Sequence, residues 1–213
     1  MDTSVSLLTY LALLISLSLH EFTHAGLAYA LGDRTAQRLG RLTLNPIRHM
    51  DLFGTVILPL MGLFSGLPFI VGWAKPVPVN PHNLRGGRWS MAMVGAAGPA
   101  SNFLAAGIFL ALLRLSLLQL PAENLLVVFL IQLVVLNVVL GIFNLIPIPP
   151  LDGSSVLAAV LDAPRWRGLI SFLERRGPLL LIALIVLDSM SSVSILRSVF
   201  RAAIGWFFSL GGL

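Results

Sequence analysis

Residues 4–31 read SVSLLTYLALLISLSLHEFTHAGLAYAL, and this stretch decides how the chain can fold. Its first part, 4–19, carries neither a charged side chain nor a histidine. As a helix of about 1.5 Å per residue it extends roughly 42 Å, more than the hydrocarbon core of a bilayer, about 30 Å. The stretch therefore predicts a membrane-spanning helix, which carries His20, Glu21 and His24 near its second end, before Gly32 and Asp33.

The rest of the chain has the same character. Apolar residues make up 57 % of the 213 residues and charged residues only 11 %, against about 25 % charged in a soluble domain. Charged residues and histidine are absent from 3–19, 52–74, 89–113, 124–151 and 177–187. These runs exclude a soluble globule, and a single secretory signal cannot explain them. We expect an all-α polytopic membrane protein embedded in the lipid bilayer.

The charge and the absence of cysteine limit the nucleic acids and metal sites that the chain can be expected to bind. The net charge is +5, but surplus arginine on a membrane protein orients it in the bilayer, and no feature indicates a nucleic-acid partner. The chain has no cysteine, so it holds no disulfide and no thiolate metal site. A metal ion would need histidine or carboxylate ligands.

The apolar runs predict about five to six membrane segments in one membrane-embedded domain, 1–213. Its core covers about 4–160, and accessory helices cover about 164–213. The expected segments are 4–31, 52–74, 89–118, 124–146, 177–196 and 198–213. The last segment is short and contains Arg201, so it could lie in the interface instead.

The run 52–74 has two possible arrangements. It is long enough to span, but its many glycines and prolines also suit a re-entrant hairpin that continues as extended backbone to about residue 81. A hairpin places eleven of the fourteen positive charges on one side, which the positive-inside tendency makes cytoplasmic. These are Arg34, Arg38, Arg41, Arg48, Lys75, Arg85, Arg88, Arg165, Arg167, Arg175 and Arg176. The hairpin also brings Asp152 to the depth of His20 and His24, so we favour it.

His20 and His24 predict a metal site. Their i, i+4 spacing places both rings on one helix face, with Glu21 beside them to act on bound water. Each such side chain costs about 2.5–3.5 kcal/mol inside a membrane, and a divalent cation would compensate the cluster. The alternative is that the three side chains only hydrogen-bond one another and neighbouring helices.

A catalytic zinc ion usually has three protein ligands and an open position. Two acidic residues, Asp152 and Asp188, are candidates for the third ligand. Asp152 is favoured because the prolines of NLIPIPPLDG, 144–153, must unwind the chain beside it. Its alternative role is to cap the helix that starts near Ser154.

Five motifs together carry a resemblance to a known family. They are HEFTH at 20–24, LNPIRHMD at 44–51, GWAKPVPVNP at 72–81, GPASN at 98–102 and NLIPIPPLDG at 144–153. In this order and membrane context the chain resembles the site-2 protease family of intramembrane zinc metalloproteases. The resemblance covers about 18–160, and it is to the compact prokaryotic branch without a PDZ or CBS domain.

The resemblance implies a three-helix zinc peptidase in the prokaryotic cytoplasmic membrane, with Zn2+ on His20, His24 and Asp152 and with Glu21 as general base. It implies a transmembrane protein or peptide substrate, cleaved near the cytoplasmic side. For Asn102 it implies a contact with the substrate strand or the oxyanion, although an intramembrane amide can also join helices. Asn144 has the same two interpretations, and His49 and His82 suit loop packing.

A second class of function stays open at this stage. A zinc- or proton-linked transporter, or an inactive homologue that only binds membrane helices, would also use broken helices and intramembrane carboxylates. The sequence shows no duplicated halves, and a transporter has no evident need for Glu21 directly after a ligand histidine.

Overall fold

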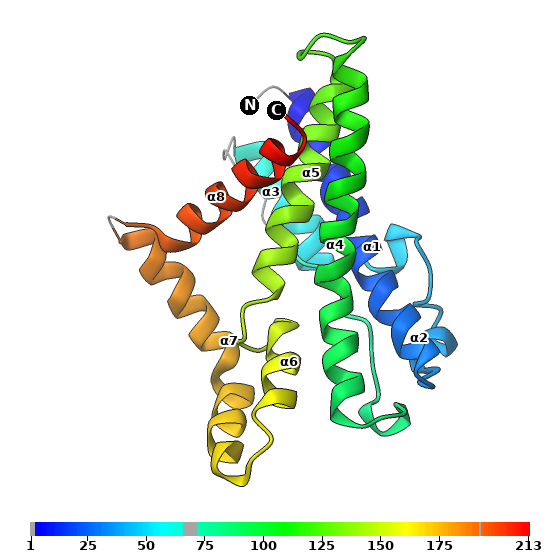
Figure 1. Ribbon diagram of the computed structural model, residues 1–213, viewed down its shortest axis with the longest axis vertical. Helices are drawn as coiled ribbons and strands as arrows, with labels where there is room; N and C mark the ends of the chain where they lie inside the picture. The colour runs from blue at the N-terminus through cyan, green and yellow to red at the C-terminus, as the bar shows by residue number, and fades with distance from the viewer. Residues whose placement is uncertain (1–2, 66–71, 192) are drawn as a thin grey trace.

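The computed structural model describes residues 3–65, 72–191 and 193–213, and within these ranges the chain is helical without a strand (Figure 1). The α-helices in the described ranges are α1 (Thr3–Ala30), α2 (Thr35–Arg38), α3 (Leu58–Ser65), α4 (Arg88–Leu117), α5 (Leu125–Asn144), α6 (Gly153–Val160), α7 (Arg167–Met190) and α8 (Ile195–Leu210). A π-helical turn, Leu52–Ile57, leads into α3.

Helices α1, α4 and α5 form the core of the molecule. Each packs against the other two, and α4 and α5 run antiparallel side by side (Figure 1). Their shared interior is built from alanine, valine and leucine, including Ala12, Ala106, Leu113 and Val134. Small side chains let the helix backbones approach closely, which is the main source of packing energy between helices in lipid.

Three helices in the described part of the chain are long and apolar enough to cross a membrane: Ser4–Ala30, Arg88–Leu117 and Leu125–Asn144. A fourth span is possible only if α7 and α8, which meet at 84°, count as one. The expected five to six segments are therefore too many. Three expected segments do not qualify as spans. The first half of α7 contains several charged residues. The 16 residues of α8 extend only about 24 Å, and the apolar helix Leu52–Gly62 is shorter still.

The two ends of the run 52–74 lie side by side and are joined by hydrogen bonds. The Trp73 amide donates to the Gly54 carbonyl at 3.1 Å, and the Thr55 hydroxyl donates to the Trp73 carbonyl at 2.8 Å. Residues 72–80 then continue without helix, as the alternating prolines predict. The middle of the expected hairpin, 66–71, lies outside the described residues.

The loops on either side of this run meet at one end of the helical bundle. The Arg85 amide donates to the Leu31 carbonyl at 2.8 Å, so the start of α4 lies beside the end of α1. Arg88 forms an ion pair with Asp162, which follows α6. The start of α1, the C-terminus and the α4–α5 turn lie at the opposite end (Figure 1). The histidines of α1 are therefore nearer the end that carries these loops.

The C-terminal helices attach to the core unequally. Helix α8 packs on α5 and α4, where Phe207 stacks on Phe103. Most of α7 is exposed or half-buried, and only its Gly177 is buried, against Pro149. The division into a core of 4–160 and accessory helices of 164–213 stays a prediction.

Candidate metal centre

His20 and His24 face the same side of α1, as their spacing predicts. Both are buried, with 4 % and 8 % of their surfaces exposed, and their Nε2 atoms lie 3.0 Å apart. The rings meet edge to face at an interplanar angle of 83°. This arrangement aims both Nε2 atoms at one point.

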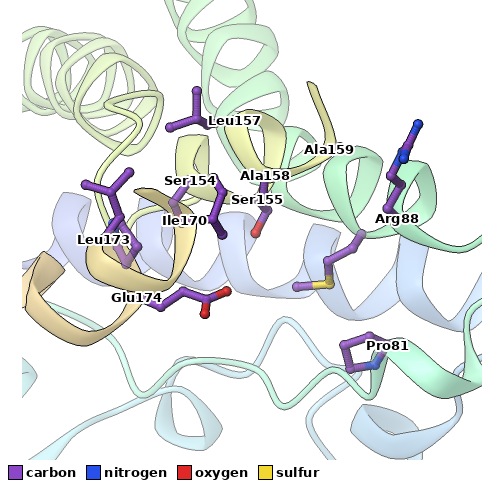
Figure 2. Close-up of a pocket in the computed structure, with 12 residues that line it drawn as sticks. Pro81, Arg88, Ser154, Ser155, Leu157, Ala158, Ala159, Ile170, Leu173 and Glu174 are labelled. Atoms are coloured by element: carbon purple, nitrogen blue, oxygen red, sulfur yellow. The ribbon is translucent and has the colours of Figure 1, made fainter. Parts of the chain in front are cut away.

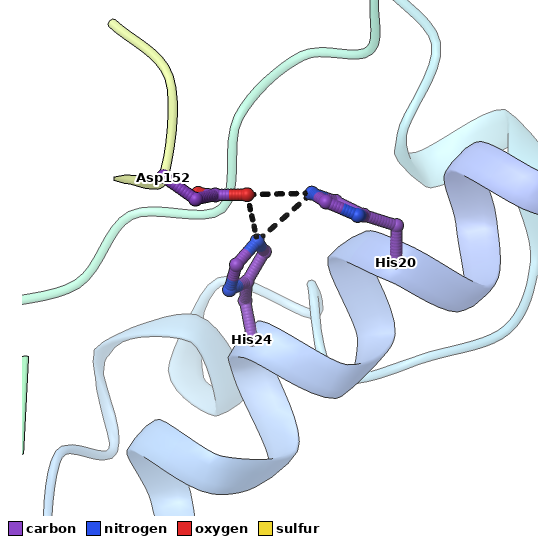
Figure 3. Close-up of side chains that lie close together, drawn as sticks. All are labelled: His20, His24 and Asp152. Carbon is purple, nitrogen blue, oxygen red and sulfur yellow. Dashed lines mark hydrogen bonds and ion pairs between the residues drawn. The ribbon is translucent and has the colours of Figure 1, made fainter. Parts of the chain in front are cut away.

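The structure brings Asp152 to that point from the unwound segment after α5. Its Oδ2 lies 3.0 Å from Nε2 of His20 and 3.3 Å from Nε2 of His24, and Figure 3 shows the carboxylate pointing at both rings. Asp152 precedes α6, but its side chain makes no capping hydrogen bond. The alternative prediction, that the side chain of Asp152 caps α6, is therefore wrong.

The hydrogen bonds on the far side of the rings fix their protonation. Nδ1 of His24 lies 2.7 Å from the Val94 carbonyl, and Nδ1 of His20 lies 2.6 Å from Oδ1 of Asn102. Both partners are acceptors, so each Nδ1 carries a hydrogen, and in the neutral ring Nε2 is then the atom with the lone pair. Oδ2 of Asp152 has no hydrogen-bond partner among the described residues.

Nε2 of His20, Nε2 of His24 and Oδ2 of Asp152 thus converge on one point, and one ligand atom from each residue lies within 4.8 Å of the others. With neutral rings, three lone pairs face one another here, and only a cation or a proton between them removes their repulsion in a buried environment. Two imidazole nitrogens and one carboxylate oxygen form a donor set typical of catalytic zinc, so the residues fit a divalent metal ion.

Glu21 lies beside these ligands on the same helix. It is 8 % exposed, and its Oε2 accepts a hydrogen bond of 2.8 Å from the Val77 amide. Val77 belongs to the extended segment 72–80, so that segment fixes the orientation of this carboxylate.

Two glycines let α4 approach the site. A Cβ atom on Gly98 would lie 2.6 Å from Cε1 of His20, and one on Gly95 would lie 3.0 Å from the Asp152 carbonyl. Both distances are shorter than side chains normally allow. Gly98 belongs to the GPASN motif, so part of that motif's function is to make room for the histidine rings.

Asn102 does not lie on an open surface. It is fully buried, its Oδ1 faces His20, and its Nδ2 donates to Oδ1 of Asn137 at 2.8 Å. Asn137 is also fully buried. In this structure the amide of Asn102 contacts a candidate metal ligand and a neighbouring helix, as the helix-joining interpretation expects, and its contact with a substrate stays a prediction.

The remaining candidates lie elsewhere. Asn144 donates to the Leu140 carbonyl of its own helix. His49 is buried in its loop, with Nε2 2.7 Å from the Thr43 carbonyl, and His82 is exposed. Asp188 accepts hydrogen bonds from Ser194 and Leu196 and is absent from the metal cluster found in the described residues.

Three contributors to the site were missed from the sequence. The Val94 carbonyl and the Val77 amide are backbone groups, so their residue types give no signal. Asn137 does give one, because an amide within an apolar span needs a partner. That argument, applied to Asn102 and Asn144, applies equally to Asn137.

A cavity of about 320 Å³ is lined by Pro149 and Ser154, which lie close to Asp152 in the sequence. It lies between α4, α6 and α7, with Ser154 and Ser155 on the α6 side and Glu174 on α7 (Figure 2). Most of its lining is apolar, including Met91, Leu157, Ile170 and Leu173. An apolar side chain would fit this cavity.

The family model of peptidase family M50 matches residues 8–124 and 114–185. The two matches together include all the residues of the candidate metal centre. The chain belongs to peptidase family M50.

Curated relatives agree with this M50 membership. A Bacillus subtilis protein named "Putative zinc metalloprotease YwhC" is 37 % identical over 85 % of this chain and 82 % of its own length. Proteins named "Putative zinc metalloprotease Rip2", from Mycolicibacterium smegmatis and Mycobacterium tuberculosis, are each 31 % identical over 94 % of this chain and 72 % of their own lengths. No solved structure matches the chain.

Proposed function

We propose that this M50 peptidase is an intramembrane zinc metalloprotease, which hydrolyses peptide bonds in or near the transmembrane segments of other membrane proteins. The observation that carries the proposal is the meeting of His20, His24 and Asp152, from segments far apart in the sequence, beside the carboxylate of Glu21. The relatives named as zinc metalloproteases support zinc as the metal.

Each residue of the site has a defined task. Nε2 of His20, Nε2 of His24 and Oδ2 of Asp152 would hold the ion. When bound, zinc polarises the scissile carbonyl and lowers the pKa of water toward about 7. Glu21 accepts the proton from the attacking water and passes it to the leaving amine. The Val77 amide holds one oxygen of Glu21, which leaves the other oxygen to exchange the proton.

The substrate would reach the site from the side of α6 and α7. A helix hides its carbonyl groups, so the cleaved segment must be unwound before it is attacked. The extended segment 72–80 offers main-chain groups for pairing with such a strand, and the cavity between α4, α6 and α7 offers room for an apolar side chain. Both features suit a substrate drawn from a transmembrane helix.

We place the protein in the prokaryotic cytoplasmic membrane, with 52–81 as a re-entrant hairpin and the metal nearer the cytoplasmic face. Supporting this, the loops after α1 and before α4 meet at one end of the bundle, and this end carries most of the arginines. Loops rich in arginine and lysine stay on the cytoplasmic side. A site near one face also admits the water that hydrolysis consumes.

Replacing Glu21 by glutamine tests the proposal. The substitution keeps the size of the side chain and removes its ability to accept a proton, so we expect zinc content to be unchanged and cleavage to fall by at least about 100-fold. The measurement is processing of a co-expressed single-span protein by wild type and Glu21→Gln. Cleavage by the variant at the wild-type rate would contradict this mechanism, and metal-dependent transport without cleavage by the wild type would favour a transporter.

A further inference from the structure

We infer that Asn137 and Asn102 form a positioning relay that fixes the tautomer of His20, so that its Nε2 always presents a lone pair to the metal. The inference rests on the proposed function, since it assumes that His20 is a metal ligand. It assigns a role to Asn137, and it gives Asn102 a different role from the substrate contact expected from the family resemblance.

The relay is a continuous set of hydrogen bonds across three helices. Nδ2 of Asn137 on α5 donates to the Leu133 carbonyl and to Oγ of Ser16, each at 2.8 Å. Oδ1 of Asn137 accepts from Nδ2 of Asn102 on α4 at 2.8 Å. Oδ1 of Asn102 lies 2.6 Å from Nδ1 of His20 on α1. Each contact is short enough for a direct bond.

The direction of this set follows from its far end. The Leu133 carbonyl can only accept, so the nitrogen of the Asn137 amide must face it. The oxygen of Asn137 then faces Asn102, where only the NH2 group can donate. The oxygen of Asn102 is left for His20, and an acceptor at that place requires a hydrogen on Nδ1.

Ser16 fixes the same direction independently. Its hydroxyl hydrogen goes to the Ala12 carbonyl at 2.7 Å, so its oxygen is free to accept the second hydrogen of the Asn137 amide. Flipping Asn137 would therefore turn an oxygen toward two acceptors at once. Two anchors that require the same orientation make the relay one-directional.

Burial makes the relay effective. Ser16, Asn102 and Asn137 are each 0 % exposed, so water cannot replace a lost partner. Without Asn137, only a long contact of 3.5 Å from Nδ2 of Asn102 to the Ser16 carbonyl would oppose a turn of the Asn102 amide, and after such a turn its NH2 group would favour a hydrogen on Nε2. Asn137 removes that choice, because it accepts only from the nitrogen of Asn102.

The two histidines are thus held by different means. His24 donates to the Val94 carbonyl, a backbone group that no substitution can turn around. His20 depends on amide side chains that can flip. A relay is needed at His20 alone, and this is where the structure supplies one.

The experiment measures zinc affinity of the purified full chain by competition with a chromophoric chelator, and the absorption spectrum of the Co2+-loaded protein. We compare wild type, Asn137→Leu and the matched control Asn144→Leu, the same substitution on the same helix at a residue that donates only to Leu140. We expect Asn137→Leu to bind zinc roughly 10- to 100-fold more weakly and to change the Co2+ spectrum. Asn144→Leu should do neither.

A second substitution separates positioning from general damage. In the Asn137→Leu background, Asn102→Asp gives His20 a partner that accepts with either oxygen, so no orientation has to be selected. We expect this double variant to recover zinc affinity to within about threefold of wild type, because carboxylate–histidine–zinc contacts are favourable. A merely structural role for Asn137 predicts no recovery, since the lost contacts to Leu133 and Ser16 stay lost.

A measurement on the unaltered protein makes the test independent of how the variants fold. Nitrogen-15 NMR of labelled wild type identifies which ring nitrogen of His20 carries the hydrogen, and we expect Nδ1 both with and without zinc. An Nδ1 of His20 without a hydrogen in the metal-free protein, or wild-type zinc affinity in Asn137→Leu, overturns the relay. Absence of zinc binding in the wild type would instead overturn the proposed function.

Discussion

At the scale of single residues, the site depends on a glycine that leaves space for the histidine rings as well as on the residues that would bind the metal. Gly98 sits where α4 crosses the two histidines, and any Cβ atom there would meet both rings. Two imidazoles can share one ion only if their Nε2 atoms converge, so a displacement of either ring would separate the ligands. The absence of a side chain at Gly98 is therefore a requirement of the metal centre.

Gly98→Ala tests this requirement. The added methyl group must push His20 or His24 away from the shared point, so we expect zinc affinity to fall at least tenfold, within the roughly 10- to 100-fold range found for groups that orient metal ligands. The control is Gly107→Ala on the same helix, where a Cβ atom meets nothing within 4 Å. Equal zinc affinity for the two variants would show that α4 does not constrain the rings.

Some residues of this site are easier to predict from the sequence than others, because some lie close together along the chain and others lie far apart. The relation of His20, Glu21 and His24 is local, because helix geometry fixes residues four apart. Asp152 can be assigned only by placing a later segment at the same depth, and that required an argument about topology. What holds the histidines in place, such as the Val94 carbonyl, depends on packing between helices that no motif records.

At the scale of elements, one carboxylate connects the end of α1 to the extended segment 72–80 and to the 3-10 turn Pro81–Asn83 that follows it. Asp33 is fully buried and accepts from the Asn80 amide at 2.7 Å, from Nδ2 of Asn83 at 3.0 Å and from Thr35. The other end of the segment holds Glu21 through Val77. Asp33 thereby helps to place the segment that orients the proposed base.

The pKa of Asp33 makes this tie sensitive to acid. Burial alone raises the pKa, but hydrogen bonds from Thr35, Asn83 and Asn80 outweigh it and lower the pKa to about 2 from the ordinary 3.8. A carboxyl whose pKa is lower in the folded state stabilises the fold above its unfolded pKa, and this stabilisation is lost as pH falls through the folded value. The expected window is between about pH 4 and pH 2.

Thermal unfolding in detergent measures the effect. We expect the pH dependence of Tm in that window to be weaker in Asp33→Asn than in wild type, and Tm at neutral pH to be lower because a charged acceptor is lost. Glu123→Gln, at an exposed position in the α4–α5 turn, serves as the control and should follow the wild type. An Asp33→Asn curve parallel to wild type at every pH would contradict the assignment.

The sequence predicts a helix correctly where a single apolar run corresponds to that whole helix. It fails where a helix extends beyond its apolar run into charged residues. The runs that became α1, α4 and α5 are long and nearly free of charge, so lipid is their only suitable environment. The apolar run 177–187 predicts a separate span over 177–196. In the structure, α7 begins ten residues earlier, at Arg167, and includes a charged turn around Glu174. Hydropathy alone does not reveal that a helix continues through such a turn.

At the scale of the whole molecule, the arrangement predicts which loops share a side of the membrane. The segments after α1, before α4 and between α6 and α7 lie at one end of the molecule, and the α4–α5 turn lies at the other (Figure 1). By their numbers, Leu39, His82 and Arg165 belong to these three segments and Glu123 to the turn. If 52–74 crossed the membrane completely, the loops of Leu39 and His82 would face opposite sides. The side on which each loop lies therefore tests the re-entrant hairpin.

The chain has no cysteine, so single cysteines can report these sides directly. We expect a membrane-impermeant maleimide to label Glu123→Cys in intact cells, and to label Leu39→Cys, His82→Cys and Arg165→Cys only after the membrane is opened. Labelling of His82→Cys but not Leu39→Cys in intact cells would replace the hairpin by a full span.

The central claim is that two distant parts of the chain hold one ion, and the zinc content of purified protein tests it most directly. We would measure zinc per chain by mass spectrometry for wild type, for Asp152→Ala and for the control Asp188→Ala, whose carboxylate accepts hydrogen bonds from Ser194 and Leu196 instead. The account predicts about one zinc ion in wild type and control, and less than about a tenth of that in Asp152→Ala, because two histidines alone bind weakly. Equal zinc in Asp152→Ala and wild type would contradict it.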